Sequence, residues 1–279
     1  MKLWVVGASG LLGSALLELC RTRGVDAASS VRGDVDLFCL EEIEQFVQSH
    51  QITHIVNCVA YTNVDLAEEE VELAYQVNAK IPENLGKIAA LLSLKLIHIS
   101  TDFVFSGEKN EPYREEDLCA PLGNYGKSKL EGERLLVSTF PSACIVRTSN
   151  LFGRGGKSLS SKLFQLLQTN APLTLVFDLV SRATYSKDLA ELLIALLPHS
   201  GIFHFANVGS CNRLQMAEEA RLLLPKSSSQ FLPILSRDCF AKHIRPRYSV
   251  LSTKKIEALL NIKPRSWQEA LKEFSQHAL

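Results

Sequence analysis

The fold of this chain is decided by residues 3–13, LWVVGASGLLG, in which an apolar run leads directly into three glycines spaced three apart. The apolar run predicts a buried β-strand, and the leucines after the second glycine predict the start of a helix. Glycines permit a tight turn and close backbone approach to a pyrophosphate, whose negative charge the free N–H groups of a helix start favour. We therefore predict a dinucleotide site, with cofactor contacts from Gly7, Ser9, Gly10, Leu11, Leu12 and Gly13.

Outside this turn, the chain alternates short β-rich runs with longer amphipathic stretches. Strands are predicted at THIVNCV (53–59), LKLIHIS (94–100) and ACIVRTS (143–149), and helices at 11–23, 40–50 and 66–79. Such alternation indicates parallel strands joined by crossover helices. The predicted fold is α/β, a Rossmann-type doubly wound parallel sheet. Residues 1–149 would form the NAD(P)-binding domain, with returning segments near 174–206, and residues 150–279 mainly a smaller substrate-binding region.

Composition excludes several classes of partner. Thirty basic residues balance thirty acidic ones, without the basic excess expected of a protein that binds nucleic acid or an anionic membrane. The N-terminus does not resemble a signal peptide, and no run of about 18 apolar residues could span a bilayer. We expect a cytoplasmic protein with no metal site, since His50 and His54 stand four apart but belong to a helix end and a strand start.

A tyrosine and a lysine stand four positions apart in NYGKSKLEGE, residues 124–133. On a helix, Tyr125 and Lys129 point to the same side, within reach of one bound molecule. A nearby ammonium favours the phenolate, which would lower the pKa of the tyrosine and make it usable in proton transfer. The alternative is two unrelated surface residues, because the Y-x-x-x-K pattern also arises by chance.

The predicted strand at 94–100 supports the catalytic interpretation. Ligands of open α/β sheets bind beyond the carboxyl ends of the strands, where Thr101 would lie. Its hydroxyl and the Tyr125 phenol could converge on one carbonyl oxygen. Asp102 and Phe103 follow directly and are predicted to contact the substrate, although Asp102 could instead only orient the loop.

Almost the whole chain resembles the extended short-chain dehydrogenase/reductases, and within them the dTDP-4-dehydrorhamnose reductase family. The resemblance rests on the glycine run, the Y-x-x-x-K pair, and the stretches NCVAYTNVDLAEEEVELAYQVNA, HISTDFVFSG, IVRTSNLFG, NVGSC and RPRYSVL. It implies hydride transfer from a reduced nicotinamide to the C4 ketone of a nucleotide-linked 6-deoxy sugar.

The resemblance also implies roles for individual residues. Tyr125 would protonate the developing alkoxide, Lys129 would bind the nicotinamide ribose, and Thr101 would orient the same oxygen. The family's wall against the cofactor corresponds to Val59, Ala60 and Tyr61, and its adenine contact to Asp36 and Leu37; plain core and loop are the alternative for these five.

Departures from the family pattern fall on the sugar side. Asn150 stands where close relatives carry tryptophan, and residues 178–184, DLVSRAT, lack the glutamine, glycine and proline of the usual D-Q-x-G-x-P-T. Because aromatic stacking and tight-turn geometry are lost, this region would reshape the substrate lid, with Asn150 among the substrate contacts. Arg245, with Ser249 and Lys255, is predicted to contact a substrate diphosphate.

The end of the second strand decides between NADPH and NADH. An enzyme that selects NAD usually places an acidic residue there to accept from the ribose 2′-hydroxyl. Here Ser29 and Ser30 are followed by Arg32, whose guanidinium can pair with a 2′-phosphate. NADPH is predicted, and NADH stays the alternative because Asp34 lies close by.

Two other functions stay open at this point. One is a non-catalytic subunit like the regulatory subunit of methionine adenosyltransferase, since a fold does not guarantee chemistry. The other is a reductase or epimerase of a different nucleotide sugar. The partner expected is a small nucleotide-sugar substrate, and the oligomeric state is open, with a homodimer as one alternative.

Overall fold

A parallel six-stranded sheet forms the centre of the computed structural model, which describes residues 1–155, 159–239 and 245–278. The strands are β1 (Leu3–Val6), β2 (Ala27–Ser30), β3 (His54–Asn57), β4 (Lys95–Thr101), β5 (Cys144–Thr148) and β9 (Gly201–His204). Their order is β2-β1-β3-β4-β5-β9, so the winding direction reverses between β1 and β3. Ligands of such sheets bind at this reversal, beyond the carboxyl ends of the strands.

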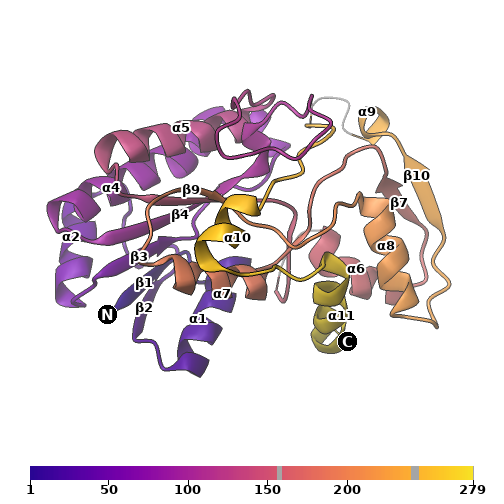
Figure 1. Ribbon diagram of the computed structural model, residues 1–279, viewed down its shortest axis with the longest axis horizontal. Helices are drawn as coiled ribbons and strands as arrows, with labels where there is room; N and C mark the ends of the chain where they lie inside the picture. Colours follow the sequence, from indigo (N-terminus) through magenta and orange to yellow (C-terminus); the bar gives the residue numbers. More distant parts are fainter. Residues whose placement is uncertain (156–158, 240–244, 279) are drawn as a thin grey trace.

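Helices cover both faces of the sheet, as Figure 1 shows. One face carries α1 (Leu11–Arg23), α7 (Ser186–Leu196) and α10 (Lys254–Leu260), and the other carries α2 (Leu40–Ser49), α4 (Ile81–Leu91) and α5 (Asn124–Thr139). Strand β1 is buried on both faces. Leu3 and Val5 belong to the core on the side of α1, α7 and α10, and Trp4 and Val6 belong to the core on the side of α2, α4 and α5. An unbroken apolar run is what a doubly covered parallel strand requires. The predicted fold class is confirmed.

A separate core lies beside the sheet. It is built by α6 (Leu159–Gln168), β7 (Leu173–Val176), α8 (Arg213–Leu222), β10 (Phe231–Ile234) and α11 (Trp267–Ala278), which gather to one side of the sheet in Figure 1. Phe164, Trp267 and Phe274 are fully buried at its centre. Two short pieces, β6 (Leu151–Phe152) and β8 (Thr184–Tyr185), pair in parallel, and α9 (Ser236–Cys239) completes the region. The domain boundary at 149/150 stays a prediction.

The helix predicted at 66–79 is wrong in its bounds. The structure has a 3₁₀ turn η1 (Leu66–Glu68), α3 (Val71–Tyr75) and a π turn η2 (Gln76–Lys80) that continues into α4. Pro82 has no N–H to donate to the Asn78 carbonyl, so the regular ladder cannot be kept there. That carbonyl lies instead against Gly132 of α5, where an added Cβ would stand only 2.0 Å from the Asn78 oxygen.

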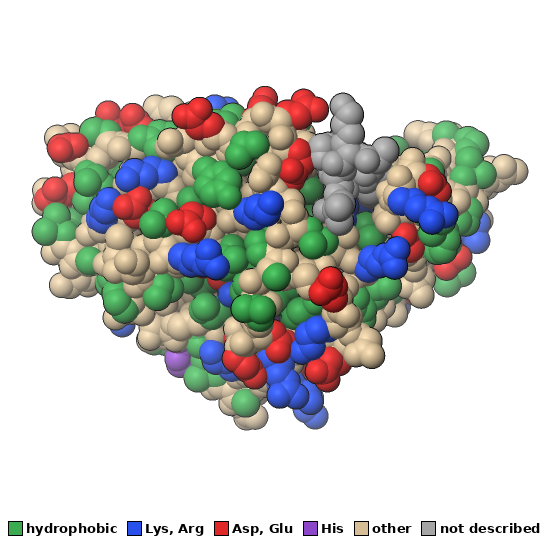
Figure 2. Space-filling model, turned by 90° about the horizontal axis from the view of Figure 1, so that it is seen from above, with side chains coloured by type: hydrophobic (Ala, Val, Ile, Leu, Met, Phe, Trp, Pro, Cys, Tyr) green, Lys and Arg blue, Asp and Glu red, His purple; other side chains and the backbone are tan. Residues whose placement is uncertain are grey.

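The surface carries charges of both signs. Figure 2 shows Lys and Arg interspersed with Asp and Glu over the face that it presents, in keeping with a net charge of +0. Among the described residues, we find no helix whose length and apolar character would allow it to cross a bilayer.

Candidate active site

The glycine turn after β1 has the geometry of a cradle. Gly7 adopts a left-handed φ of +81°, and a Cβ on it would lie 2.9 Å from Val59 Cγ2. A Cβ on Gly13 would lie 2.3 Å from the Gly7 carbonyl oxygen, which is closer than side chains tolerate. Glycine is therefore required both for the turn and for the close approach of α1 to it.

The start of α1 presents N–H groups of the kind that bind phosphate. Gly10 is its N-cap, and no side-chain hydrogen bond caps this end within the described structure. Ser9 and Gly10 are exposed, Leu11 is half-buried, and Leu12 anchors the helix in the core. The exposed turn and the uncapped N–H groups fit a dinucleotide diphosphate.

Residues 59–61 form a wall opposite this turn, held by two buried asparagines. The Val59 N–H donates to Asn57 Oδ1 (3.0 Å), and the Tyr61 N–H donates to Asn78 Oδ1 (2.8 Å). Asn78 also donates from Nδ2 to Ser128 Oγ (3.0 Å), which ties the wall to α5. Ala60 lies between these two anchored positions. Asn78 thereby fixes the spacing between residues 59–61 and α5.

The loop after β2 carries the residues for which sequence predicts contact with the adenosine end of the cofactor. Arg32 is exposed, whereas Asp34 accepts from the Val31 N–H through Oδ2 (2.7 Å) and so folds back on its own turn. Asp36 Oδ1 accepts from the Phe38 N–H (2.9 Å), and the Leu37 carbonyl accepts from Asn84 of α4 (3.1 Å). Asp34, the acidic residue that left NADH open, is thus hydrogen-bonded within its own turn, whereas no ion pair of Arg32 is found among the described residues.

The N-terminus of α5 is fixed from outside the helix. Glu68 accepts from both the backbone N–H and the side-chain Nδ2 of Asn124, the residue just before Tyr125. Gly126 allows the helix to approach η3 (Asp102–Val104), because a Cβ there would stand 2.2 Å from the Phe103 carbonyl oxygen. The position of Tyr125 is therefore set by groups on three elements.

Tyr125 and Thr101 meet at the carboxyl end of the sheet. The Tyr125 hydroxyl lies near enough to the Thr101 side chain for it to lower the pKa of Tyr125, and the Tyr125 ring packs edge-on against Phe103 with centroids 5.6 Å apart. Thr101 Oγ1 also donates to Asp102 Oδ1 (3.2 Å) and accepts from the Phe103 N–H (3.2 Å). The structure thus brings together the two hydroxyls that the sequence places on one substrate oxygen.

Lys129 lies one turn further along α5 and is 1 % exposed. Its Nζ donates to the Ile99 carbonyl (2.6 Å) and lies 3.2 Å from His98 Nε2. Burial lowers the pKa of Lys129 to about 8, while the neighbouring Glu133 and Cys58 act in the opposite direction.

The electrostatics of Tyr125 differ from the sequence-based expectation. Burial raises the pKa of Tyr125 to about 12, the Thr101 side chain lowers it, and the Asp102 carboxylate raises it. The expected lowering by Lys129 does not arise in this arrangement, because the amine is turned toward β4. A phenol with this pKa holds its proton at neutral pH and can serve as a proton donor.

Residues 245–252 cross the reactive end of the sheet, and we call them the crossing segment. Its Ser249 Oγ donates to Asp102 Oδ2, and Gly107 admits Pro246, since a Cβ on that glycine would lie 2.5 Å from Pro246 Cβ. Burial raises the pKa of Asp102 to about 7, although its hydrogen bonds with Ser249 and Thr101 lower it. Asp102 therefore joins the end of β4 to the crossing segment. These contacts favour the alternative that Asp102 orients the loop.

Asn150 and residues 178–184, which sequence assigns to the substrate lid, lie in ordered backbone, and Val180 pairs with the crossing segment. The Val180 backbone donates to Arg247 O (2.8 Å) and accepts from the Ser249 N–H (2.9 Å). Asn150 has a left-handed φ of 39°, a conformation that asparagine tolerates, and its Oδ1 accepts from Ser160 Oγ (2.8 Å). The structure gives Asn150 a turn-forming role that a tryptophan would fill less easily.

An arginine lies at the start of the crossing segment. Arg245 Nη2 donates to Asp65 Oδ1 (2.8 Å), and its side chain is 7 % exposed. Burial, and then the charge of Arg245, lower the pKa of Arg213 at the start of α8. The structure does not bring Lys255 to these arginines, because its Nζ donates to the Ile202 carbonyl of β9 (2.7 Å).

Sequence reasoning missed Arg213. It is the first residue of α8, directly after the N-cap Asn212, whose side chain accepts from the Gln215 N–H. A cation is unfavourable at a helix N-terminus, where the dipole favours negative charge. The Asp65 carboxylate partly offsets this cost, since its charge acts on Arg213.

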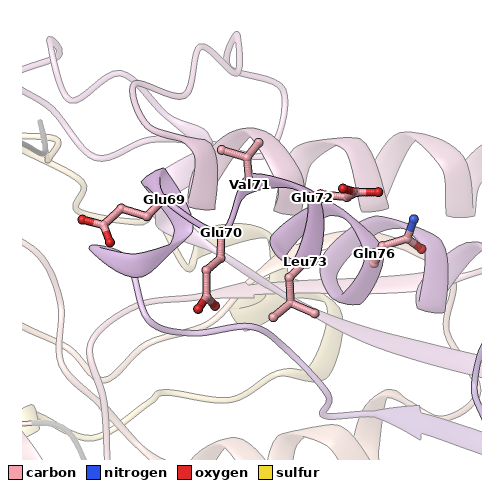
Figure 3. A pocket seen from close by; sticks show the side chains of 6 residues that line it. All are labelled: Glu69, Glu70, Val71, Glu72, Leu73 and Gln76. Carbon is pink, nitrogen blue, oxygen red and sulfur yellow. The ribbon is translucent and has the colours of Figure 1, made fainter.

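A surface hollow at η1 and α3 does not belong to the site. It is open and has a volume of about 460 Å³. Figure 3 shows the side chains that line it, Glu69, Glu70, Val71, Glu72, Leu73 and Gln76. Its carboxylates would repel an anionic nucleotide. Within residues 1–155, 159–239 and 245–278, no group of three or more His, Cys, Asp or Glu is placed to hold a metal ion.

Comparison with known proteins gives matches along the full length. Residues 1–279 match the family model described as RmlD substrate binding domain. The spore coat polysaccharide biosynthesis protein SpsK of Bacillus subtilis (strain 168) is 35% identical, with 99% of this chain and 97% of that protein covered. The dTDP-4-dehydrorhamnose reductase of Streptomyces griseus is 34% identical, with 97% and 92% covered.

A solved structure agrees closely with the fold. The dTDP-4-dehydrorhamnose reductase of Bacillus anthracis str. Ames, crystallised in complex with NADP, superimposes with a TM-score of 0.94 at 30% identity and covers 99% of both chains. This chain is therefore similar, over its entire length, to reductases of dTDP-linked sugars.

Proposed function

The chain belongs to the RmlD substrate binding domain family, that of the dTDP-4-dehydrorhamnose reductases, and from this premise we propose that it reduces the C4 ketone of a dTDP-linked 4-keto-6-deoxy sugar with NADPH. The observation that carries the proposal is that Thr101 and Tyr125 lie together at the carboxyl end of β4, with Lys129 one turn further along α5 and bonded to Ile99 of the same strand. This arrangement puts a proton donor at the same end of the sheet as the cofactor cradle.

Each part of the site has a task in this reaction. NADPH, when bound along the glycine turn and the 59–61 wall, supplies the hydride that adds to the ketone carbon. Tyr125 transfers its hydroxyl proton to the ketone oxygen as charge develops there, and Thr101 donates a hydrogen bond to the same oxygen. Lys129 binds the nicotinamide ribose. The products are the alcohol and the oxidised nucleotide.

The substrate end is assigned to the second set of residues. Phe103 and Asn150 would contact the sugar, and Asp102 would orient the loop that carries Phe103. Arg245 and Arg213 would neutralise the diphosphate, since paired guanidinium groups hydrogen-bond well to phosphate oxygens. We propose dTDP-4-dehydrorhamnose as the sugar.

Purified protein with NADPH and dTDP-4-dehydrorhamnose should consume the reduced nicotinamide, followed by its absorbance, and release the 6-deoxy alcohol, identified by mass spectrometry. The matched control is dTDP-glucose, which carries the same nucleotide but no ketone and should give no oxidation. A dTDP-linked 4-keto-6-deoxyglucose, which has the opposite configuration at C3 and C5, tests whether the altered substrate region accepts that epimer. Absence of turnover with either ketosugar would contradict the proposal.

Replacing Arg32 with Ala should raise KM for NADPH about 10–100-fold and leave KM for NADH nearly unchanged. The lost charged hydrogen bond to the 2′-phosphate would cost about 1.5–3 kcal/mol, and NADH has no such phosphate. Steady-state kinetics with both nucleotides measure the effect, with Arg21→Ala, also exposed and at the end of α1, as the matched control. Equal effects on both nucleotides would remove Arg32 from the cofactor site.

A further inference from the structure

Three buried side chains form a row beneath the active site. Asn57 on β3 and His98 on β4 are paired in register and 0 % exposed, and Lys129 on α5 is 1 % exposed. Asn57 Nδ2 lies 3.1 Å from His98 Nδ1, and His98 Nε2 lies 3.2 Å from Lys129 Nζ. Both ring nitrogens of His98 therefore face a nitrogen.

The proton positions in this row follow from its two ends. The Val59 N–H can only donate, so its partner on Asn57 is Oδ1 (3.0 Å), and Asn57 Nδ2 is the group that faces the ring. An amide nitrogen donates and does not accept, so His98 Nδ1 must accept. A neutral imidazole then carries its proton on Nε2, which points at Lys129.

This placement restricts the charge of Lys129. Its Nζ already donates to the Ile99 carbonyl (2.6 Å). A neutral amine can donate there and accept from the His98 Nε2–H with its lone pair. An ammonium has no lone pair, so it would force the proton of His98 to Nδ1 and turn the Asn57 amide away from Val59.

We propose that His98 is a positioning residue that holds the neutral amine form of Lys129 against β4 at alkaline pH, and that Lys129 must there take up a proton from solvent when it turns to the ribose of NADPH. This inference rests on the proposed function. The ribose hydroxyl oxygens accept hydrogen bonds, and the dinucleotide is an anion, so both favour the ammonium form. Charge on Lys129 is thereby linked, through His98 and Asn57, to the backbone of the cofactor wall at Val59.

The other titratable groups near this row have pKa values that differ from that of Lys129. Burial lowers the pKa of Lys129 to about 8 and holds that of His98 well below its usual value. Burial raises the pKa of Cys58 and of Tyr125 to about 12, and that of Asp102 to about 7. Glu133, the remaining charged neighbour, stabilises the ammonium. Between pH 8 and pH 9, the group of this set that changes charge is Lys129.

The test is the pH dependence of NADPH binding, measured by the fluorescence of the bound nucleotide. With a pKa of about 8 in the free protein, loss of the proton should weaken binding about 5-fold from pH 8 to pH 9. In His98→Gln the amide oxygen can accept from the ammonium, so Lys129 stays charged at both pH values and binding should change less than about 2-fold.

Two variants serve as controls. His204→Gln removes an equally buried histidine of the same sheet, which contacts Arg147 rather than Lys129, and should keep the wild-type pH dependence. Lys129→Met should bind NADPH more weakly and with no dependence between pH 8 and pH 9. A wild-type profile in His98→Gln would overturn the role of His98, and a retained profile in Lys129→Met would overturn the titration of Lys129.

A second measurement needs no variant and no nucleotide. The ¹⁵N chemical shifts of the His98 ring at pH 9 distinguish the two neutral tautomers, and the Nε2–H form is expected. The Nδ1–H form would overturn the inference even if NADPH binds as proposed. Failure of NADPH to bind, together with the Nε2–H form, would instead count against the cofactor assignment and leave the His98 arrangement standing.

Discussion

Tyr125→Phe should lower kcat for ketone reduction by about 10²–10⁴ while leaving the affinity for NADPH within about 2-fold. The substitution removes the hydroxyl that lies near Thr101 and keeps the ring that packs on Phe103. Without the proton donor, negative charge on the reacting oxygen is met by Thr101 alone. Single-turnover kinetics at saturating NADPH and substrate measure the chemical step directly.

Tyr75→Phe is the matched control for this prediction, because Tyr75 is another half-buried tyrosine, placed in α3. It should retain wild-type kcat. Turnover of Tyr125→Phe within about 3-fold of wild type would show that another group protonates the oxygen and would remove Tyr125 from its role.

Glu133→Gln should reduce the free energy of unfolding by about 3–5 kcal/mol. Glu133 on α5 and Arg147 on β5 form an ion pair whose side chains are only 4% and 3% exposed. Arg147 donates to the carboxylate from Nε (2.9 Å) and Nη2 (2.7 Å). Glutamine keeps the shape of the side chain but leaves the guanidinium buried without its countercharge. Urea unfolding at neutral pH gives the loss from the midpoint and slope.

Glu131→Gln gives the comparison on the same helix. Glu131 pairs with Arg134 at 3.8 Å, and both side chains are substantially exposed. Such surface pairs contribute at most about 1 kcal/mol, so this variant should unfold near the wild-type midpoint. Similar losses in the two glutamine variants would mean that the buried pair has no special weight in stability.

The sequence predicted those parts of the site whose geometry depends on residues close together in the chain. The turn from Gly7 to Gly13 follows from a strand, a left-handed glycine and a helix start, all within eleven residues. Tyr125 and Lys129 share a helix face by spacing alone. Thr101 was placed because a parallel strand ends where ligands bind.

What sequence could not predict depends on partners far along the chain. The turn of Lys129 toward β4, which contradicts its expected effect on the pKa of Tyr125, depends on His98, 31 residues earlier. The break at η2 depends on how Pro82 and Gly132 meet the Asn78 carbonyl. The pairing of Arg147 with Glu133 is likewise a tertiary contact, and no periodicity in either segment indicates it.

The crossing segment has a consequence for the order in which the molecule assembles. Ser249 reaches Asp102 across 147 residues, and Arg245 reaches Asp65 across 180. Closing such long loops is slow, and chain synthesis delivers residues 245–252 after the whole sheet has emerged. The glycine turn is encoded early and by neighbours in sequence, whereas the segment that we propose for the sugar side follows every strand of the central sheet. A nascent or C-terminally shortened chain would therefore be able to acquire a nucleotide before it could hold a substrate.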